Sequence, residues 1–199
     1  MDLRDQIIMD RAPLFAVPRF DPLPKLPDHG HAYLAAEDGL WLYVQRPWLI
    51  AMHPVAVSEI PLPYGKAYPH RTFGFTIADL HQAINRFILQ ARDARPNEAA
   101  AWVVWNSNSA TLDYRPLQPL HATPGSITFD RPRLDDHETL AIDLHSHGDA
   151  PAFWSATDDE DDTGEVKLAV VVGEVNDSKP AIRIRLCLLG LFIDLDSPL

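Results

Sequence analysis

The feature that most limits the folds open to this 199-residue chain is one amphipathic helix near its middle, over residues 76–95. Apolar side chains recur there every three or four residues, which is the spacing that gives a helix one buried face. Thr76 is suited to cap this helix, with Asp79 three residues on, and Pro96 ends it. The apolar positions are Ile77, Leu80, Ile84, Phe87, Ile88 and Ala91. A long helix among strand-like segments predicts a mixed α/β (α+β) domain.

The segments that follow the helix have the composition of strands. They are short, rich in β-branched and aromatic residues, and separated by turn-forming residues. We expect strands over residues 100–105, 111–115, 139–144, 167–173 and 181–195. In the last of these, apolar residues alternate with Arg183 and Arg185, which predicts one apolar and one solvated face. These elements predict a mixed domain over residues 75–199.

The first 74 residues differ because proline is dense at their start. Five prolines fall within the first 30 residues, at positions 13, 18, 22, 24 and 27. Since proline disrupts helix interiors and central strands, we expect residues 1–28 to form an extended surface arm. Strand-like segments at 32–34 and 40–44 flank Glu37-Asp38-Gly39, which predicts a hairpin. Residues 1–74 are therefore predicted to be a Pro-rich and β-rich N-terminal extension.

Charge and cysteine content limit the partners and the compartment. The chain has 28 acidic and 17 basic residues, a formal net charge of −11, and its basic residues are scattered. Neither nucleic acid nor an anionic membrane is therefore expected as a partner. The single cysteine, Cys187, is expected to be buried and suits a reducing compartment. The charged N-terminus lacks the apolar core of a signal peptide, and no apolar run reaches the roughly 18 residues of a membrane span, so we expect a cytoplasmic protein.

Residues 143–158 carry most of the chemical information. His145 and His147 are two residues apart, so in a strand both imidazoles lie on one face and can bind one ion. Asp158 can return after a loop to supply a carboxylate oxygen as a third ligand. Two histidines, one carboxylate and a water form the open tetrahedral set of a catalytic zinc site.

The same stretch also has simpler interpretations. Ser155 and Asp158 fit the N-cap and N3 positions of a helix that begins there. We interpret residues 159–162 as a solvated first turn of that helix, favoured by the helix dipole. Asp143 shares a face with the histidines, and it is either a partner behind the site or a solvated strand residue. None of these roles excludes metal binding.

Taken together, the motif residues resemble a known family signature. The pattern His145-Ser-His147, seven residues, Ser155, two residues and Asp158 is similar to that of the JAMM (MPN-plus, JAB) zinc metalloproteases. It matches without insertion or deletion. The resemblance covers roughly residues 75–195. It implies a JAMM/MPN-like fold for the second domain, a central β-sheet flanked by helices, and leaves the N-terminal extension outside.

Members of that family also have a glutamate in a Pro-x-Glu context after the first long helix. Pro96-Asn97-Glu98 matches that context, although Glu98 as an ordinary carboxylate at a helix end is the simpler alternative. The chain departs from the family pattern at Gly148, where a proline is usual. It departs again at Ala100-Ala101, where Cys-Gly is common. Neither departure removes a metal ligand.

The resemblance implies one zinc ion per chain, held by His145, His147 and Asp158 with water in the fourth position. Glu98 would accept a proton from that water and deliver it to the leaving amine. Ser155 would donate a hydrogen bond to the carbonyl oxygen as negative charge develops on it. Family members usually cleave after the C-terminal glycine of ubiquitin or a ubiquitin-like protein, so such a protein or its conjugate is the expected substrate.

Other functions fit the sequence less well. A metallo-β-lactamase pattern begins with His145-x-His147-x-Asp149, but Ala150 stands where it needs histidine, and no histidine follows His147. An amidohydrolase barrel also opens with His-x-His, but it needs about 250 residues. The remaining alternative is a catalytically silent JAMM-like scaffold that binds proteins. Inactive relatives usually lack a motif residue, whereas this chain retains all five.

Overall fold

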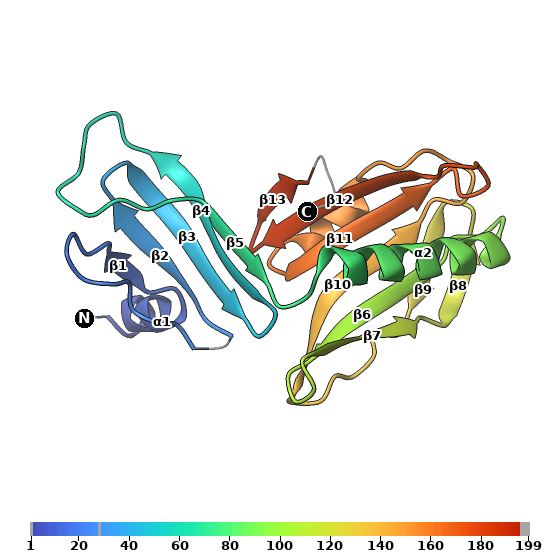
Figure 1. Cartoon of the computed structure of the whole chain (residues 1–199), viewed down its shortest axis with the longest axis horizontal. Helices are drawn as coiled ribbons and strands as arrows, with labels where there is room; N and C mark the ends of the chain where they lie inside the picture. The colour runs from blue at the N-terminus through green and yellow to red at the C-terminus, as the bar shows by residue number, and fades with distance from the viewer. Residues whose placement is uncertain (1, 28, 196–199) are drawn as a thin grey trace. The chain divides into compact units, whose positions relative to one another are not determined.

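The computed structural model describes residues 2–27 and 29–195, and the chain forms two compact units, Met1–Gly74 and Phe75–Leu199 (Figure 1). The predicted mixed α/β (α+β) class is confirmed, because the described residues form three α-helices alongside thirteen strands in three sheets. None of the helices in this described part combines the length and hydropathy that crossing a bilayer requires.

The N-terminal unit is built around a five-stranded sheet in the order β1-β2-β3-β4-β5. Its strands are β1 (Leu14–Ala16), β2 (His31–Ala36), β3 (Gly39–Arg46), β4 (Leu49–Val57) and β5 (His70–Phe73). The predicted hairpin is confirmed as β2–β3. Gly39 adopts a φ of +140° at its turn, where a Cβ would lie 2.1 Å from the carbonyl oxygen of Ala56. Only glycine fits that position.

The prediction of an extended arm over residues 1–28 is wrong in part. Residues Leu3–Arg11 form helix α1, whose N-cap Asp2 accepts a hydrogen bond from the backbone N–H of Arg4. The first proline is Pro13, so nothing in this segment breaks a helix. Leu14–Ala16 then pairs in parallel with β2 as an edge strand, a position that tolerates the prolines on either side.

The C-terminal unit has a six-stranded sheet in the order β13-β12-β11-β10-β6-β7, and a separate hairpin of β8 and β9. The strands are β6 (Ala100–Asn106), β7 (Thr111–Pro116), β8 (Pro119–Thr123), β9 (Ser126–Phe129), β10 (Glu138–Ser146), β11 (Val166–Gly173), β12 (Ala181–Leu188) and β13 (Leu191–Asp194). Neighbouring strands are antiparallel except β10 and β11, which are parallel.

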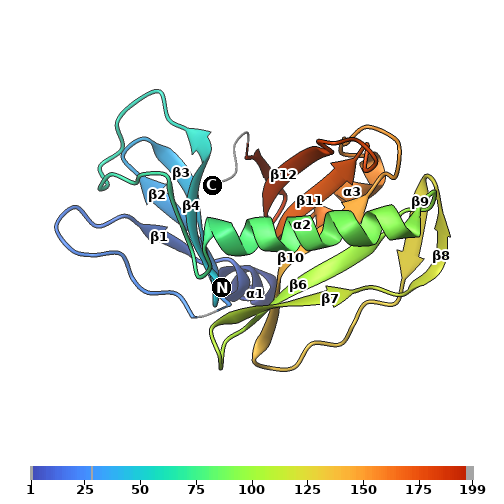
Figure 2. The ribbon, with the colours of Figure 1, turned by 45° about the vertical axis from the view of Figure 1, so that its right-hand side comes forward.

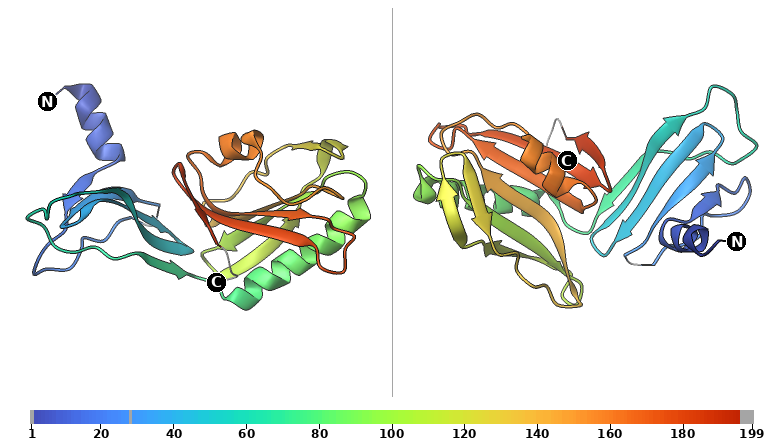
Figure 3. Two further views of the ribbon diagram at one scale, coloured as in Figure 1. Left: turned by 90° about the horizontal axis from the view of Figure 1, so that it is seen from above. Right: turned by 180° about the vertical axis from the view of Figure 1, so that it is seen from behind.

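Two helices cover opposite faces of this sheet (Figures 2 and 3). Helix α2 (Ile77–Ala94) matches the predicted helix, with the Thr76–Asp79 capping box formed in both directions, and buries its apolar face. Helix α3 (Ala156–Asp162) lies over the other face. Because successive residues of a strand point to opposite faces, β10 sends Ile142 and Leu144 toward α2, and Asp143 and His145 toward α3.

Two strand predictions are corrected in this unit. The single strand expected over 181–195 is a hairpin, since Leu189 and Gly190 adopt φ of 51° and 98° and turn the chain into β13. The expected solvated face of that strand is confirmed for Arg183, which is exposed, and wrong for Arg185, which is buried beneath α3. The β8–β9 hairpin was not predicted, although Leu120 and Ala122 in one strand and Ile127 and Phe129 in the other alternate with polar residues around Pro124-Gly125.

Candidate metal centre

The two histidines come from the end of β10, a strand in the interior of the sheet. His145 pairs with Val171 of β11 on one side and with Ala100 of β6 on the other. His147 lies one residue beyond the strand, and its backbone N–H donates to the carbonyl of Val172 at 2.9 Å. These backbone bonds fix both residues on the face that α3 covers, as the predicted spacing requires.

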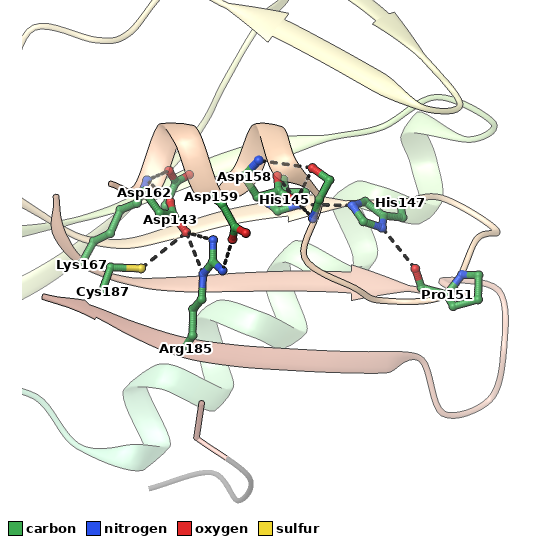
Figure 4. A network of polar contacts seen from close by, with 11 residues as sticks. Asp143, His145, His147, Pro151, Asp158, Asp159, Asp162, Lys167, Arg185 and Cys187 are labelled. Carbon is green, nitrogen blue, oxygen red and sulfur yellow. Dashed lines mark hydrogen bonds and ion pairs between the residues drawn. The ribbon is translucent and has the colours of Figure 1, made fainter. Parts of the chain in front are cut away.

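The structure brings His145, His147 and Asp158 together (Figure 4). The His145 Nε2 atom lies 3.3 Å from His147 Nε2 and 3.3 Å from Asp158 Oδ1, and one ligand atom from each residue lies within 4.8 Å of the others. Two donors bound to one zinc at about 2.0–2.1 Å with tetrahedral angles would be about 3.3 Å apart. The spacing therefore fits a cation of that size.

The protonation of the imidazoles also fits a metal. His147 Nδ1 lies 3.1 Å from the carbonyl oxygen of Pro151, which can only accept, so Nδ1 carries the proton and Nε2 presents a lone pair. Burial lowers the pKa of His145, against the opposing effect of the Asp158 carboxylate. The lowered pKa favours the neutral imidazole of His145, which is the form that binds metals.

Asp158 uses its two carboxylate oxygens for different roles. Oδ2 takes part in the capping box of α3, and Oδ1 is the candidate metal ligand. Its Oδ2 accepts hydrogen bonds from the Ser155 backbone N–H and hydroxyl, each at 2.7 Å, while its own N–H donates to Ser155 Oγ at 3.2 Å. This capping box leaves Oδ1 facing His145. The two sequence interpretations of Ser155 and Asp158 are therefore compatible in one geometry.

Glu98 lies beside the same group of residues. Its side chain lines a cavity of about 250 Å³ together with His145, His147 and Asp158, and it is only 8% exposed. Burial, assisted by the negative charge of Asp158, raises the pKa of Glu98 to about 7. A carboxyl group that titrates near neutrality is suited both to accept and to release a proton.

Backbone contacts hold Glu98 against the histidine strand. Its N–H donates to the carbonyl of Thr123 at 2.9 Å. The next N–H, of Ala99, donates to the buried Ser146 hydroxyl at 2.9 Å, and the Ser146 N–H donates back to the Ala99 carbonyl at 3.0 Å. The residue between the two histidines thus positions the segment that carries the glutamate.

The structure explains why Gly148 stands where the family pattern usually has proline. Its φ is +56°, a left-handed conformation that proline cannot adopt because its ring fixes φ near −65°. A Cβ at Gly148 would also lie 3.2 Å from the carbonyl oxygen of Pro96. Arg95 and Asp149 join the same two segments by paired hydrogen bonds of 2.9 and 3.0 Å. The departure therefore accompanies a close approach between the metal loop and the glutamate segment.

The interpretation of residues 159–162 as a solvated turn is wrong for Asp162. This carboxylate is 4% exposed and lies between Lys167 Nζ, at 2.8 Å, and the guanidinium of Arg185, at 2.6 Å. Asp143 accepts from Lys167 at 2.7 Å, so it is a paired residue behind the site. The sequence pattern did not single out Lys167 and predicted a solvated Arg185, because the partners of both lie on other elements. Cys187 is buried as predicted.

A second group of potential ligands, Asp135, His137 and Glu138, lies at the start of β10. Glu138 already accepts from the guanidinium of Arg115 and from the N–H of Asp135. Arg115 lowers the pKa of Glu138 to about 2. Because the Glu138 carboxylate is already paired with Arg115, these three residues are a weaker candidate metal site than His145, His147 and Asp158.

Comparison with known proteins divides the chain at the same place as its fold. Residues 80–187, more than half of the chain, match the family described as prokaryotic homologs of the JAB domain, and residues 2–74 match a domain of unknown function, DUF2016. No curated protein matches the chain. A similar solved structure is the solution structure of protein DSY2949 from Desulfitobacterium hafniense, with 18% sequence identity and a TM-score of 0.44. That match covers 57% of this chain and 86% of the other.

Proposed function

The chain belongs to the prokaryotic homologs of the JAB domain, and from this premise we propose that it is a zinc-dependent peptidase or isopeptidase. The observation that carries the proposal is the convergence of His145 Nε2, His147 Nε2 and Asp158 Oδ1 beside a buried glutamate. Three candidate metal ligands, a carboxyl with a pKa of about 7 and a cavity that all of them line are the parts of a hydrolytic site.

His145, His147 and Asp158 would hold the zinc ion, which when bound lowers the pKa of a coordinated water to about 7. The donor set suits zinc, because two neutral imidazoles and one carboxylate leave a fourth position open. The second oxygen of Asp158 is held by Ser155, so the carboxylate offers its Oδ1 in a fixed orientation.

Glu98 is the proposed general base and acid. Its carboxylate accepts a proton from the attacking water, and the same proton then passes to the nitrogen of the scissile amide as the carbon–nitrogen bond breaks. The products are a free carboxylate and a free amine. Burial keeps this carboxyl out of bulk water and, in the metal-free protein, raises its pKa to about 7.

Ser155 is the proposed donor to the carbonyl oxygen of the substrate. A serine hydroxyl can donate one hydrogen bond, and here the Ser155 hydroxyl donates it to Asp158 Oδ2. Turning the hydroxyl toward a substrate would break that bond and leave Asp158 Oδ2 with the Ser155 backbone N–H. The cap would therefore survive the change.

The proposed substrate is a ubiquitin-like protein or its conjugate, cut after the C-terminus of that protein, and the proposed location is the cytoplasm. The family resemblance supports this substrate class. A formal charge of −11 favours a partner with a basic surface. The alternative is a catalytically silent scaffold that binds proteins.

The decisive experiment measures the metal content of the full-length protein by elemental analysis after incubation with zinc and removal of the excess. We expect about one zinc ion per chain in the wild type and much less in Asp158→Ala, whose two remaining ligands bind the ion too weakly to retain it when the excess is removed. Glu160→Ala, which removes an exposed carboxylate from the same helix, is the matched control and should retain zinc. A wild type without zinc would favour the silent scaffold.

A second measurement separates binding from catalysis. A ubiquitin-like protein with a C-terminal extension is incubated with zinc-loaded wild type and with Glu98→Gln. Glu98→Gln should retain its zinc and lose cleavage, because glutamine keeps the shape of the side chain but cannot accept the proton. Loss of zinc from Glu98→Gln would show that Glu98 is a ligand and that the base lies elsewhere.

A further inference from the structure

Helix α3, which carries Asp158, has almost no apolar anchor. Its sequence is Ala-Thr-Asp-Asp-Glu-Asp-Asp, and its one buried side chain is that of Asp162. A helix of seven residues is too short to be stable by itself in water, so tertiary contacts must hold it. Those contacts are not hydrophobic here. The position of Asp158 therefore depends on how an acidic helix is attached to the sheet.

Lys167 makes that attachment from β11. Its Nζ lies 2.8 Å from Asp162 Oδ1 of α3 and 2.7 Å from Asp143 Oδ2 of β10 (Figure 4). The lysine side chain is 3% exposed and the Asp162 side chain 6%. Burial acts to lower the pKa of Lys167, but the two carboxylates outweigh it and raise the pKa. A charged lysine thus lies between the helix and the sheet.

Arg185 of β12 supports the same helix from the other side of Asp162. Its guanidinium donates to Asp162 Oδ2 at 2.6 and 2.9 Å and to Asp159 Oδ1 at 2.6 Å. It also lies over the rings of Trp154 and Phe192, 4.1 and 4.2 Å from their centroids. The two cations balance the charge of Asp162, which would be costly to bury alone.

Lys167 differs from Arg185 in what it connects. Asp143 lies two residues before His145 on the same face of β10, and Asp162 lies one turn after Asp158 on α3. A single ammonium group therefore joins the strand that supplies the histidine nitrogens to the helix that supplies the carboxylate oxygen. Arg185 makes no such connection, since its carboxylate partners both belong to α3.

We propose that Lys167 is a positioning residue of the metal centre, which places Asp158 against His145 and His147 by pairing Asp162 of α3 with Asp143 of β10. This inference rests on the proposed zinc site. Lys167 binds no metal and touches no substrate. Without it, Asp143 and Asp162 repel each other across a buried gap, and α3 shifts away from the histidines.

The test compares metal binding by the full-length wild type and by Lys167→Met, whose side chain is of similar length and apolar. Zinc and cobalt(II) are titrated into the metal-free proteins by calorimetry. Lys167→Met should bind about 10–100-fold more weakly, the range found for groups that support metal ligands. Lys179→Met, at an exposed lysine, is the matched control and should bind like the wild type. Equal affinities of Lys167→Met and wild type would overturn the proposal.

A double-mutant cycle separates positioning from general destabilisation. If Lys167 acts through Asp158, then Lys167→Met causes no further weakening in an Asp158→Ala background. The visible spectrum of bound cobalt(II) is the second readout. The spectrum of Lys167→Met should move toward that of Asp158→Ala, because both lose the same carboxylate ligand. Additive weakening, or a spectrum identical to wild type, would contradict a positioning role.

If Lys167→Met does not fold, Asp162→Asn replaces it in the same cycle, because asparagine keeps the side-chain shape and removes the charge that the lysine holds. It should weaken metal binding in the same direction, and cause no weakening in the Asp158→Ala background. A wild type that binds neither zinc nor cobalt(II) would overturn the proposed function and this inference together. A wild type that binds, with variants that bind equally well, would overturn this inference alone.

Discussion

The two faces of the six-stranded sheet are covered by helices held in opposite ways. On one face, α2 buries six apolar side chains against the sheet. On the other, α3 buries only Asp162, and buried cations of β11 and β12 attach it. Both helices begin with the same kind of capping box, Thr76 with Asp79 and Ser155 with Asp158. Equivalent caps thus begin helices with very different attachments.

The difference follows from what each face must do. Burial of apolar surface is the dominant stabilising term in folding and is non-directional, so it suits the face that stabilises the fold. Hydrogen-bonded ion pairs contribute less net stability when buried, but they define direction and distance. The face with the ion pairs also carries His145, His147 and Glu98. Substitutions on one face should therefore leave the other face unchanged.

The largest effect on stability is expected from the α2 face. Phe87→Ala removes a fully buried ring and should lower the free energy of unfolding by about 3–5 kcal/mol. Urea titration monitored by circular dichroism measures it. Leu89→Ala, at a 61% exposed position of the same helix, should change stability by about 0.5 kcal/mol or less. Similar losses in both variants would mean that α2 does not pack as described.

Zinc should stabilise the protein through the α3 face alone. A ligand that binds only the native state at about 1,000 times its Kd adds about 4 kcal/mol to the free energy of unfolding. We expect this increment in the wild type and also in Phe87→Ala, whose substitution lies across the sheet. His145→Ala should show none of it. Denaturant titrations with zinc and with a chelator give the increments, and a loss in Phe87→Ala would show that the faces are coupled.

The sequence predicted the α2 face better than the α3 face. Helical periodicity identified α2 with its cap, because a helix shows its apolar stripe within 18 consecutive residues. Motif spacing also picked out residues that the fold brings together. By contrast, the carboxylate partners of Lys167 and Arg185 lie on other elements, between 5 and 26 residues away, and follow no periodic pattern, so the burial of both cations was missed. The early prolines likewise obscured α1, whose own nine residues contain none.

The next largest effect on stability is expected from Glu98, which makes the stability of the metal-free protein depend on pH. Its folded pKa of about 7 exceeds the ordinary value of 4.5, so the native state binds the proton more tightly than the unfolded state does. Stability therefore falls as pH rises between about 4.5 and 7, by about 3 kcal/mol in total. Glu98→Gln removes this loss, so it should match the wild type near pH 4 and exceed it at pH 8.

Urea titrations of chelator-treated wild type and Glu98→Gln at several pH values measure that difference. Glu160→Gln, at an exposed carboxylate, is the control and should follow the wild type throughout. A difference between Glu98→Gln and wild type that does not depend on pH would mean that Glu98 is not buried as a carboxyl. Zinc should reduce the difference, because a nearby cation favours the ionised glutamate.

The smallest effect on stability is expected from Ser155→Ala, and it separates the two roles of that residue. The substitution removes the hydroxyl of the α3 capping box, which should lower the free energy of unfolding by about 1 kcal/mol. Thr76→Ala removes the equivalent hydroxyl from α2 and should lower it by a similar amount. If Ser155 also donates to the substrate carbonyl, Ser155→Ala loses a further 10²–10³-fold in turnover, roughly, at saturating zinc, and Thr76→Ala does not. Equal turnover in the two variants would leave Ser155 as a cap alone, because the losses of stability are matched and only the position relative to the metal centre differs.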